Sequence, residues 1–178
     1  MEQRIICAGF GGQGVLSIGM MLAYAGMLAD KEVTWLPSYG PEMRGGTAYC
    51  SVIVSDKKVG YPLVNEADSV IVMNRPSLVK FAPMVAPGGL LFVNSSLVSD
   101  RCERTDIETF YVPANDIALE LGNTRIANMV MLGAYLKKTD LVPVDLVLES
   151  ILKVLGENKR PLLPLNRQAI ERGAELVK

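Results

Sequence analysis

Hydrophobic residues along this chain occur in short runs between longer periodic stretches, a pattern typical of α/β proteins. Residues 70–73 and 90–93 are continuously apolar and therefore predict central strands covered on both faces. Residues 47–55 instead alternate small or apolar positions with others, which favours an antiparallel addition to the sheet. Further strands are predicted at 4–8, 33–36 and 109–112.

The longer stretches have the period of a helix. From Val144, apolar residues recur at i, i+3, i+4, i+7, i+8 and i+11, and Gly156 closes the segment. Helices are predicted at 15–29, 76–85, 115–121, 125–138, 144–155 and 163–177. The strands at 4–8 and 33–36, joined by the first helix, form a predicted βαβ unit. We therefore expect a three-layer α/β/α fold with a Rossmann-like, mostly parallel sheet and one antiparallel addition.

Composition limits the size and the partners of this fold. With 178 residues, 49% of them hydrophobic, the chain is expected to form one domain over 1–178 with a sizeable core. Its 18 basic and 19 acidic residues give a net charge of −1, so no strong field favours nucleic acid or an anionic membrane. The apolar stretch 15–29 is too short to span a bilayer. No secretory signal is visible, and a cytoplasmic location is expected.

The absence of histidine excludes more chemistry than any other count. Ser-His-Asp and Cys-His nucleophiles and two-His metal sites are not available. Cys7, Cys50 and Cys102 lie far apart and form no C-x-x-C pair, so they supply no ligand set for zinc or an iron–sulfur cluster. We therefore predict no catalytic and no metal-binding residue in this chain.

Residues 9–14, here called the glycine loop, have the spacing G-x-G-x-x-G between a predicted strand and a predicted helix. Such glycines let backbone N–H groups and a helix N-terminus approach a phosphate. An NAD site also needs an acidic residue after the second strand, and no carboxylate occurs there before Glu42. The glycines therefore indicate either anion binding or close packing alone. Gln13 either bonds a ligand or ties the loop.

Residues 37–46 follow the second predicted strand and should lie at the same carboxyl edge as the glycine loop. Tyr39, Glu42 and Arg44 bring an aromatic ring, a carboxylate and a cation to this edge. Arg44 is suited to clamp a phosphate or carboxylate, to pair with Glu42, or to take part in a protein interface. The sequence leaves these three roles open.

Three segments carry a family resemblance: Gly-Phe-Gly-Gly-Gln-Gly-Val at 9–15, Ser-Tyr-Gly-Pro-Glu-Met-Arg-Gly-Gly-Thr-Ala at 38–48, and Arg-Ile-Ala-Asn-Met-Val at 125–130 followed by Leu132-Gly133. Together they resemble the gamma subunit of the 2-oxoacid:ferredoxin oxidoreductases, over almost the whole chain. The second segment is the most specific and is more similar to the 2-oxoglutarate branch than to the pyruvate branch. Branched-chain and indolepyruvate relatives stay open.

The resemblance implies an accessory subunit of an enzyme that converts a 2-oxoacid and coenzyme A into acyl-CoA and CO₂ while reducing ferredoxin. In that family the alpha and beta chains carry thiamine diphosphate, magnesium and the 2-oxoacid site. Iron–sulfur clusters lie in beta or in a small delta chain, and the gamma domain is associated with the coenzyme A side. We therefore expect a chain that is inactive alone, has no tightly bound cofactor, and reaches ferredoxin only through the complex.

The resemblance places ligand or subunit contact at nine residues: Gly9, Gly11, Gly12, Gln13, Gly14, Tyr39, Glu42, Arg44 and Asn128. For Asn128, a buried amide without a direct ligand role is the alternative and the preferred interpretation. Two other functions stay open for the chain. One is a self-contained nucleotide- or dinucleotide-binding reductase, and the other is a structural module of a different assembly.

Overall fold

One six-stranded sheet organises the structure, a computed structural model that describes residues 1–39 and 46–178. The strand order is β2-β3-β1-β4-β5-β6. The strands are β1 Glu2–Phe10, β2 Glu32–Tyr39, β3 Thr47–Ser55, β4 Ala67–Val72, β5 Val85–Asn94 and β6 Glu108–Val112. All six predicted strands are present, most of them longer than their apolar runs.

Strand direction is parallel except at β3. Strands β1, β4, β5 and β6 pair in parallel, whereas β3 runs antiparallel to both β1 and β2. Strand β2 therefore runs in the same direction as β1, as expected for a βαβ unit, but β3 lies between them. The predicted antiparallel addition is an interior strand, which explains why Cys50, Val52, Ile53 and Val54 are all buried.

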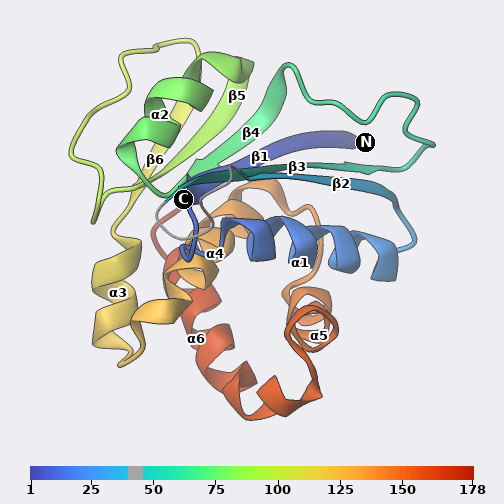
Figure 1. The fold of residues 1–178 in the computed structure, drawn as a ribbon, viewed down its shortest axis with the longest axis vertical. Coiled ribbons are helices and arrows are strands. Elements are labelled where there is room, and N and C mark those ends of the chain that lie inside the picture. The colour runs from blue at the N-terminus through green and yellow to red at the C-terminus, as the bar shows by residue number, and fades with distance from the viewer. Residues whose placement is uncertain (40–45) are drawn as a thin grey trace.

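Helices cover both faces of the sheet unequally (Figure 1). Their bounds are α1 Val15–Leu28, α2 Arg75–Phe81, α3 Ala114–Glu120, α4 Ala127–Thr139, α5 Val144–Leu155 and α6 Leu163–Ala174. Helix α2 covers one face, and the other five lie on the opposite side of the sheet. No helix within the described residues has the length and apolar character needed to cross a membrane. The three-layer α/β/α expectation is confirmed.

The core follows the two-residue alternation of the central strands. Ile5 and Cys7 of β1 face α1 and α4, whereas Ile6 and Ala8 face the side of α2. All four side chains are buried. Covering β1 on both faces fixes its register, so the loop that follows it starts from a rigid position.

The predicted helix 76–85 is too long by four residues. Helix α2 ends at Phe81, a 3₁₀ turn follows at Ala82–Met84, and Val85 already pairs with Ala67 as part of β5. Pro83 lies within this turn, where its missing N–H interrupts the helical hydrogen bonds. Pro83 therefore ends the helix before its predicted end.

Helices α4 and α6 cross at contact distance through two glycines. A Cβ at Gly133 would lie 2.0 Å from the carbonyl oxygen of Ile170, and one at Gly173 would lie 1.9 Å from that of Val130. Because both obstacles are backbone atoms, they cannot move aside by a rotamer change. The crossing therefore depends on the two glycines and holds α6 against the helix that carries Asn128.

Replacing Gly133 by alanine should force α4 and α6 apart. We expect Gly133→Ala to lower the free energy of unfolding by about 1–3 kcal/mol, the usual cost of overpacking a core. Urea unfolding followed by the fluorescence of Trp35 measures this change. Gly60→Ala is the matched control, since no atom lies within 4 Å of its added Cβ. Equal stabilities for the two variants would contradict the close crossing.

Candidate functional site at the carboxyl edge of the sheet

The glycine loop and the end of β2 meet at one edge of the sheet. In the strand register, Ala48 of β3 pairs with Gly9 on one side and with Tyr39 on the other. Two strand spacings separate Gly9 from Tyr39, about 10 Å. The loop is also joined to the start of β3, because Gly11 N donates to Gly46 O at 2.9 Å. The two segments are therefore neighbours, as the sequence predicts.

The glycine loop leads into α1 through left-handed backbone. Gly12 has φ +94° and Gly14 has φ +76°, conformations that strain any residue with a Cβ. Gly14 is the N-cap of α1, so no side chain caps the helix, and its first turn contains no acidic residue. The N–H groups of this turn and the positive end of the helix dipole are therefore available to an anion.

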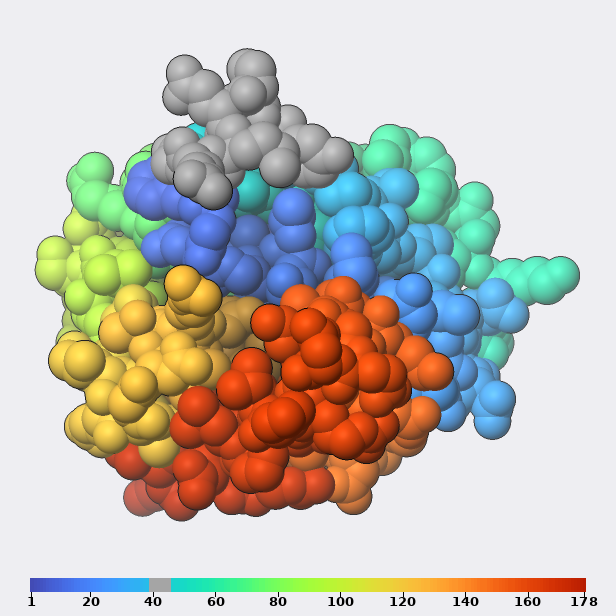
Figure 2. Space-filling model, turned by 60° about the horizontal axis from the view of Figure 1, so that its bottom comes forward, coloured from blue at the N-terminus to red at the C-terminus, as the bar shows by residue number. Residues whose placement is uncertain are grey.

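A cavity of about 430 Å³ opens over this helix start. The residues that line it belong to the glycine loop, the first turn of α1 and the start of β3: Phe10, Gly11, Gly12, Gly14, Val15, Leu16, Ser17 and Ala48. None of these residues carries a charge. In Figure 2 the blue N-terminal segment reaches the surface above the gold and orange helices. A ligand in this cavity can therefore contact backbone N–H donors, the Ser17 hydroxyl and apolar side chains.

Gln13 ties the loop to the neighbouring strand. Its Oε1 accepts from Phe10 N at 2.7 Å, and its Nε2 donates to Met73 O at 3.3 Å, just beyond β4. A Cβ at Gly9 would lie 2.7 Å from Gln13 Oε1. Gly9 is therefore needed so that the Gln13 side chain can cross the end of β1. Of the two roles that the sequence left open for Gln13, the structure shows the loop tie.

The part of this edge that the structure describes differs from a dinucleotide site. Doubly wound folds bind dinucleotides in the crevice where the strand order reverses, which here is the gap between β1 and β4. Gln13 bridges that gap from the glycine loop. On the other side of β1, where a ribose-binding acid would follow an adjacent strand, Phe10 pairs with Thr47 of β3. Within residues 1–39 and 46–178, the glycine spacing occurs without the acidic residue that a dinucleotide site needs.

Asn128 contacts the glycine loop from α4. It is 8% exposed, and its Nδ2 donates to Gly14 O at 3.4 Å. A Cβ at Gly14 would lie 2.5 Å from that nitrogen. Gly14 and Asn128, 114 positions apart, are thus in direct contact, and the preferred interpretation of a buried, hydrogen-bonded amide fits this geometry.

The remaining predicted site residues belong to the end of β2 and the segment that follows it. Tyr39 is the last residue of that strand and is placed by its backbone pairing with Ala48. Glu42 and Arg44 lie outside the described residues. Ligand contact by these three residues, like that of the glycine loop and Asn128, stays a prediction.

The sequence patterns did not indicate Asn74 as a residue of this site. It follows β4, is 4% exposed and donates from Nδ2 to Gln13 Oε1 at 3.3 Å. Its Oδ1 accepts from Ser77 N at 2.9 Å and so caps α2. Asparagine followed by Arg75-Pro76 is a recognisable helix start, but its contact with a residue 61 positions earlier has no local signal.

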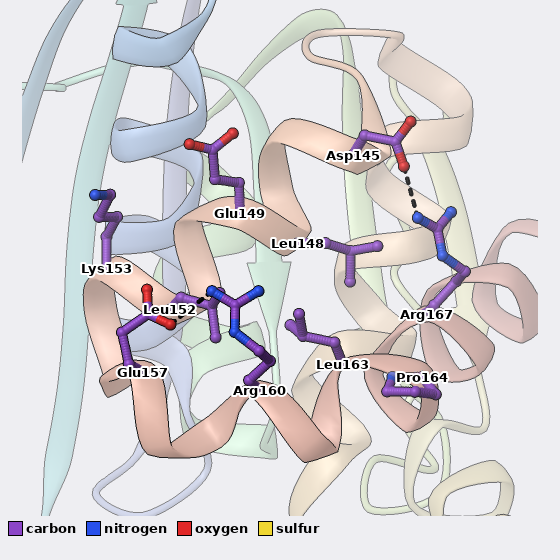
Figure 3. Close-up of a pocket in the computed structure, with 10 residues that line it drawn as sticks. All are labelled: Asp145, Leu148, Glu149, Leu152, Lys153, Glu157, Arg160, Leu163, Pro164 and Arg167. Carbon is purple, nitrogen blue, oxygen red and sulfur yellow. Dashed lines mark hydrogen bonds and ion pairs between the residues drawn. The ribbon is translucent and has the colours of Figure 1, made fainter.

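A larger cavity, of about 630 Å³, lies between α5 and the segment from the 3₁₀ helix Glu157–Leu162 to α6 (Figure 3). Leucine side chains from α5 and α6 point into it. Arg167 pairs with Asp145 and Arg160 with Glu157, each at 2.6 Å. In each of these exposed ion pairs the two charges neutralise each other. No glycine-loop residue lines this cavity. We therefore place the candidate site at the carboxyl edge.

The two cysteines near the site are buried thiols. Cys7 and Cys50 are cross-strand neighbours in β1 and β3, and both are fully buried. Hydrogen bonding to Cys50, together with burial, raises the pKa of the Cys7 thiol well above its ordinary value. At neutral pH Cys7 is therefore a protonated core residue, and no thiolate nucleophile forms there.

A glycine-loop helix start at the carboxyl edge of a mixed sheet defines a Rossmann-like α/β domain. Residues 4–176 match the model of the pyruvate ferredoxin/flavodoxin oxidoreductase family. The chain belongs to this family.

Several relatives are subunits of such enzymes. The chain is 38% identical to the ketoisovalerate oxidoreductase subunit VorA of Methanothermobacter thermautotrophicus, over 98% of its own length but 36% of that protein. The chain thus spans about a third of the length of the relatives that it matches first. It is 35% identical to the 2-oxoglutarate synthase subunit KorC of Methanothermobacter marburgensis, over 99% of this chain and 97% of that one.

A solved structure supports the same assignment. The gamma subunit of a keto/oxoacid ferredoxin oxidoreductase from Geobacter sulfurreducens superimposes with a TM-score of 0.81 and 28% identity, covering 97% of this chain and 96% of that one. The resemblance to gamma subunits, stated from three segments of the sequence, is therefore confirmed.

The contact between Gly14 and Asn128 gives a coupled prediction. Gly14→Ala should lower the free energy of unfolding by about 2 kcal/mol or more, because it adds a steric clash to roughly 1–2 kcal/mol of left-handed backbone strain. Asn128→Ala alone should cost about 1 kcal/mol. Urea unfolding of both single variants and the double variant tests their coupling.

The double variant should be less destabilised than the sum of the single variants by about 1 kcal/mol, because removing the Asn128 side chain relieves the clash. Strict additivity would show that Asn128 does not press on the glycine loop.

Proposed function

We propose that the chain is the gamma component of a 2-oxoacid:ferredoxin oxidoreductase that acts on 2-oxoglutarate, with residues 1–178 working as one gamma-type domain. Alpha and beta chains, with a small delta chain where present, supply thiamine diphosphate, magnesium and iron–sulfur clusters. This chain supplies a binding surface for these partner chains and for the phosphate groups of coenzyme A. The assignment of 2-oxoglutarate is supported by the near full-length similarity to KorC and by the sequence Glu-Met-Arg-Gly-Gly-Thr-Ala at 42–48.

One observation carries the coenzyme A proposal: the cavity of about 430 Å³ has the uncapped N-terminus of α1 as its polar wall. Phosphates are the ligands that such a helix start favours, because several N–H groups and the helix dipole act on one anion. Coenzyme A is the phosphate-bearing substrate of this reaction. The nearby side chains of Val15 and Leu16 are suited to the apolar parts of the same molecule.

The proposed division of labour agrees with the residue types in the chain. Thiamine chemistry and electron transfer need bound cofactors, and the sequence has no histidine and only three cysteines. Two of these cysteines, Cys7 and Cys50, are buried in the core. The chain's own contribution is therefore to bind and orient, while carbon–carbon cleavage takes place in the partner chains.

Ser17 allows the anion proposal to be separated from effects on stability. It is the third residue of α1 and lines the cavity. In Ser17→Asp the new carboxylate should stabilise the helix start by about 0.3–1 kcal/mol. In the complex reconstituted with its partner chains, the same charge should raise KM for coenzyme A at least about fivefold by repelling its phosphates.

Ser17→Asn is the matched control, because it has nearly the same shape without the charge. We expect its KM for coenzyme A to stay close to that of the wild type, and KM for the 2-oxoacid to be unaffected in both variants. An unchanged KM for coenzyme A in the Ser17→Asp complex, measured in low salt, would show that the phosphates of coenzyme A do not bind in this cavity.

A substrate panel tests the assignment of the 2-oxoacid. The reconstituted complex should reduce a dye with the highest kcat/KM on 2-oxoglutarate, compared with pyruvate, 2-oxoisovalerate and indolepyruvate, and only when coenzyme A and thiamine diphosphate are present. The chain alone should give no turnover. Turnover by the isolated chain, or a clear preference for another 2-oxoacid, would overturn the corresponding part of the proposal.

A further inference from the structure

A chain of hydrogen bonds runs from α2 to the glycine loop. It starts at Ser77 N, which donates to Asn74 Oδ1 at 2.9 Å. Asn74 Nδ2 then donates to Gln13 Oε1 at 3.3 Å, and the same oxygen accepts from Phe10 N at 2.7 Å. The side chains of two amide residues thus connect the end of β4 with the turn that follows β1.

The orientation of both amides is determined by their backbone partners. A backbone N–H group only donates, so the Asn74 atom facing Ser77 N and the Gln13 atom facing Phe10 N must be oxygens. The Asn74 nitrogen is then directed at the Gln13 oxygen, which is the favourable pairing. Gln13 Nε2 is left to donate to Met73 O at 3.3 Å.

Burial makes this connection specific. Asn74 is 4% exposed and Gln13 is half-buried, so the hydrogen bond between them is shielded from water on the Asn74 side. Gln13 in turn lies against Gly9, where a Cβ would be 2.7 Å from its oxygen. The loop therefore has little freedom to move while the Gln13 side chain is held from both sides.

We propose that Asn74 is a positioning residue of the glycine-loop site: acting through Gln13, it holds the loop in the conformation that presents the α1 start to its ligand. The proposal rests on the function proposed above and deepens it. Asn74 itself does not contact the ligand. Its loss should weaken coenzyme A binding by letting the loop move, without affecting the reaction step in the partner chains.

Asn74 has two roles that a substitution can separate. Asn74→Ser keeps an N-cap oxygen for α2, since serine is also a good N-cap, but its short side chain does not reach Gln13. Asn74→Asp keeps both the cap and the shape, yet presents an acceptor to the acceptor Gln13 Oε1. Both variants are expected to fold with α2 intact and to release the glycine loop.

Asn94→Ser is the matched control. Asn94 ends β5 at the same edge of the sheet, is fully buried, and donates to Asn115 Oδ1 at 2.7 Å rather than to the loop. It therefore reports the cost of losing a buried amide there without a contact to Gln13.

The experiment uses the complex assembled with its partner chains. Hydrogen exchange of a peptide covering 8–17 should become about fivefold faster in Asn74→Ser and Asn74→Asp, the size expected for one lost neutral hydrogen bond. KM for coenzyme A should rise by a similar factor while kcat stays within twofold. In Asn94→Ser neither quantity should change. In a Gln13→Ala background, Asn74→Ser should have almost no further effect.

Exchange of 8–17 that is unchanged in both Asn74 variants would overturn the proposal. It would also be overturned if the effect of Asn74→Ser persisted in full without Gln13. Faster exchange with an unchanged KM for coenzyme A would support the positioning role of Asn74 and would instead contradict coenzyme A as the ligand of the loop.

Discussion

Gln13 crosses the end of β1 because Gly9 has no Cβ, and the carboxyl edge of the sheet is arranged around this contact. The Gln13 amide joins the backbone of the glycine loop to the residue after β4. It bridges the gap that a dinucleotide would need and leaves the start of α1 facing a cavity on the other side, towards β3. A glycine spacing associated with dinucleotides thus serves a different arrangement here.

The support for this arrangement comes from the helical side of the sheet. Asn128 of α4 lies against Gly14, and α4 is itself held by α6 through the contact of Gly133 with the Ile170 backbone. Each link is a close packing of backbone on backbone or of amide on backbone, with little freedom to adjust. The proposed binding surface is therefore supported by the helices on one side and by Asn74 on the other.

The sequence predicted the fold class and the proximity of the glycine loop to the end of β2, because continuous apolar runs and periodic helices carry that information locally. It predicted β3 as an antiparallel addition but not its place between β1 and β2, since strand order depends on long-range pairing. Helix α2 ends earlier than predicted because Pro83, inside the predicted range, interrupts its hydrogen bonds. Asn74 was missed because its partner, Gln13, lies 61 positions away, and only the fold brings the two together.

The most direct test of the account is hydrogen exchange of the assembled complex with and without coenzyme A. If the start of α1 binds the phosphates, peptides covering 9–17 should become protected when coenzyme A is added, and the α5–α6 cavity should show no change. Protection confined to the partner chains, with residues 9–17 exchanging at the same rate in both states, would contradict the central claim.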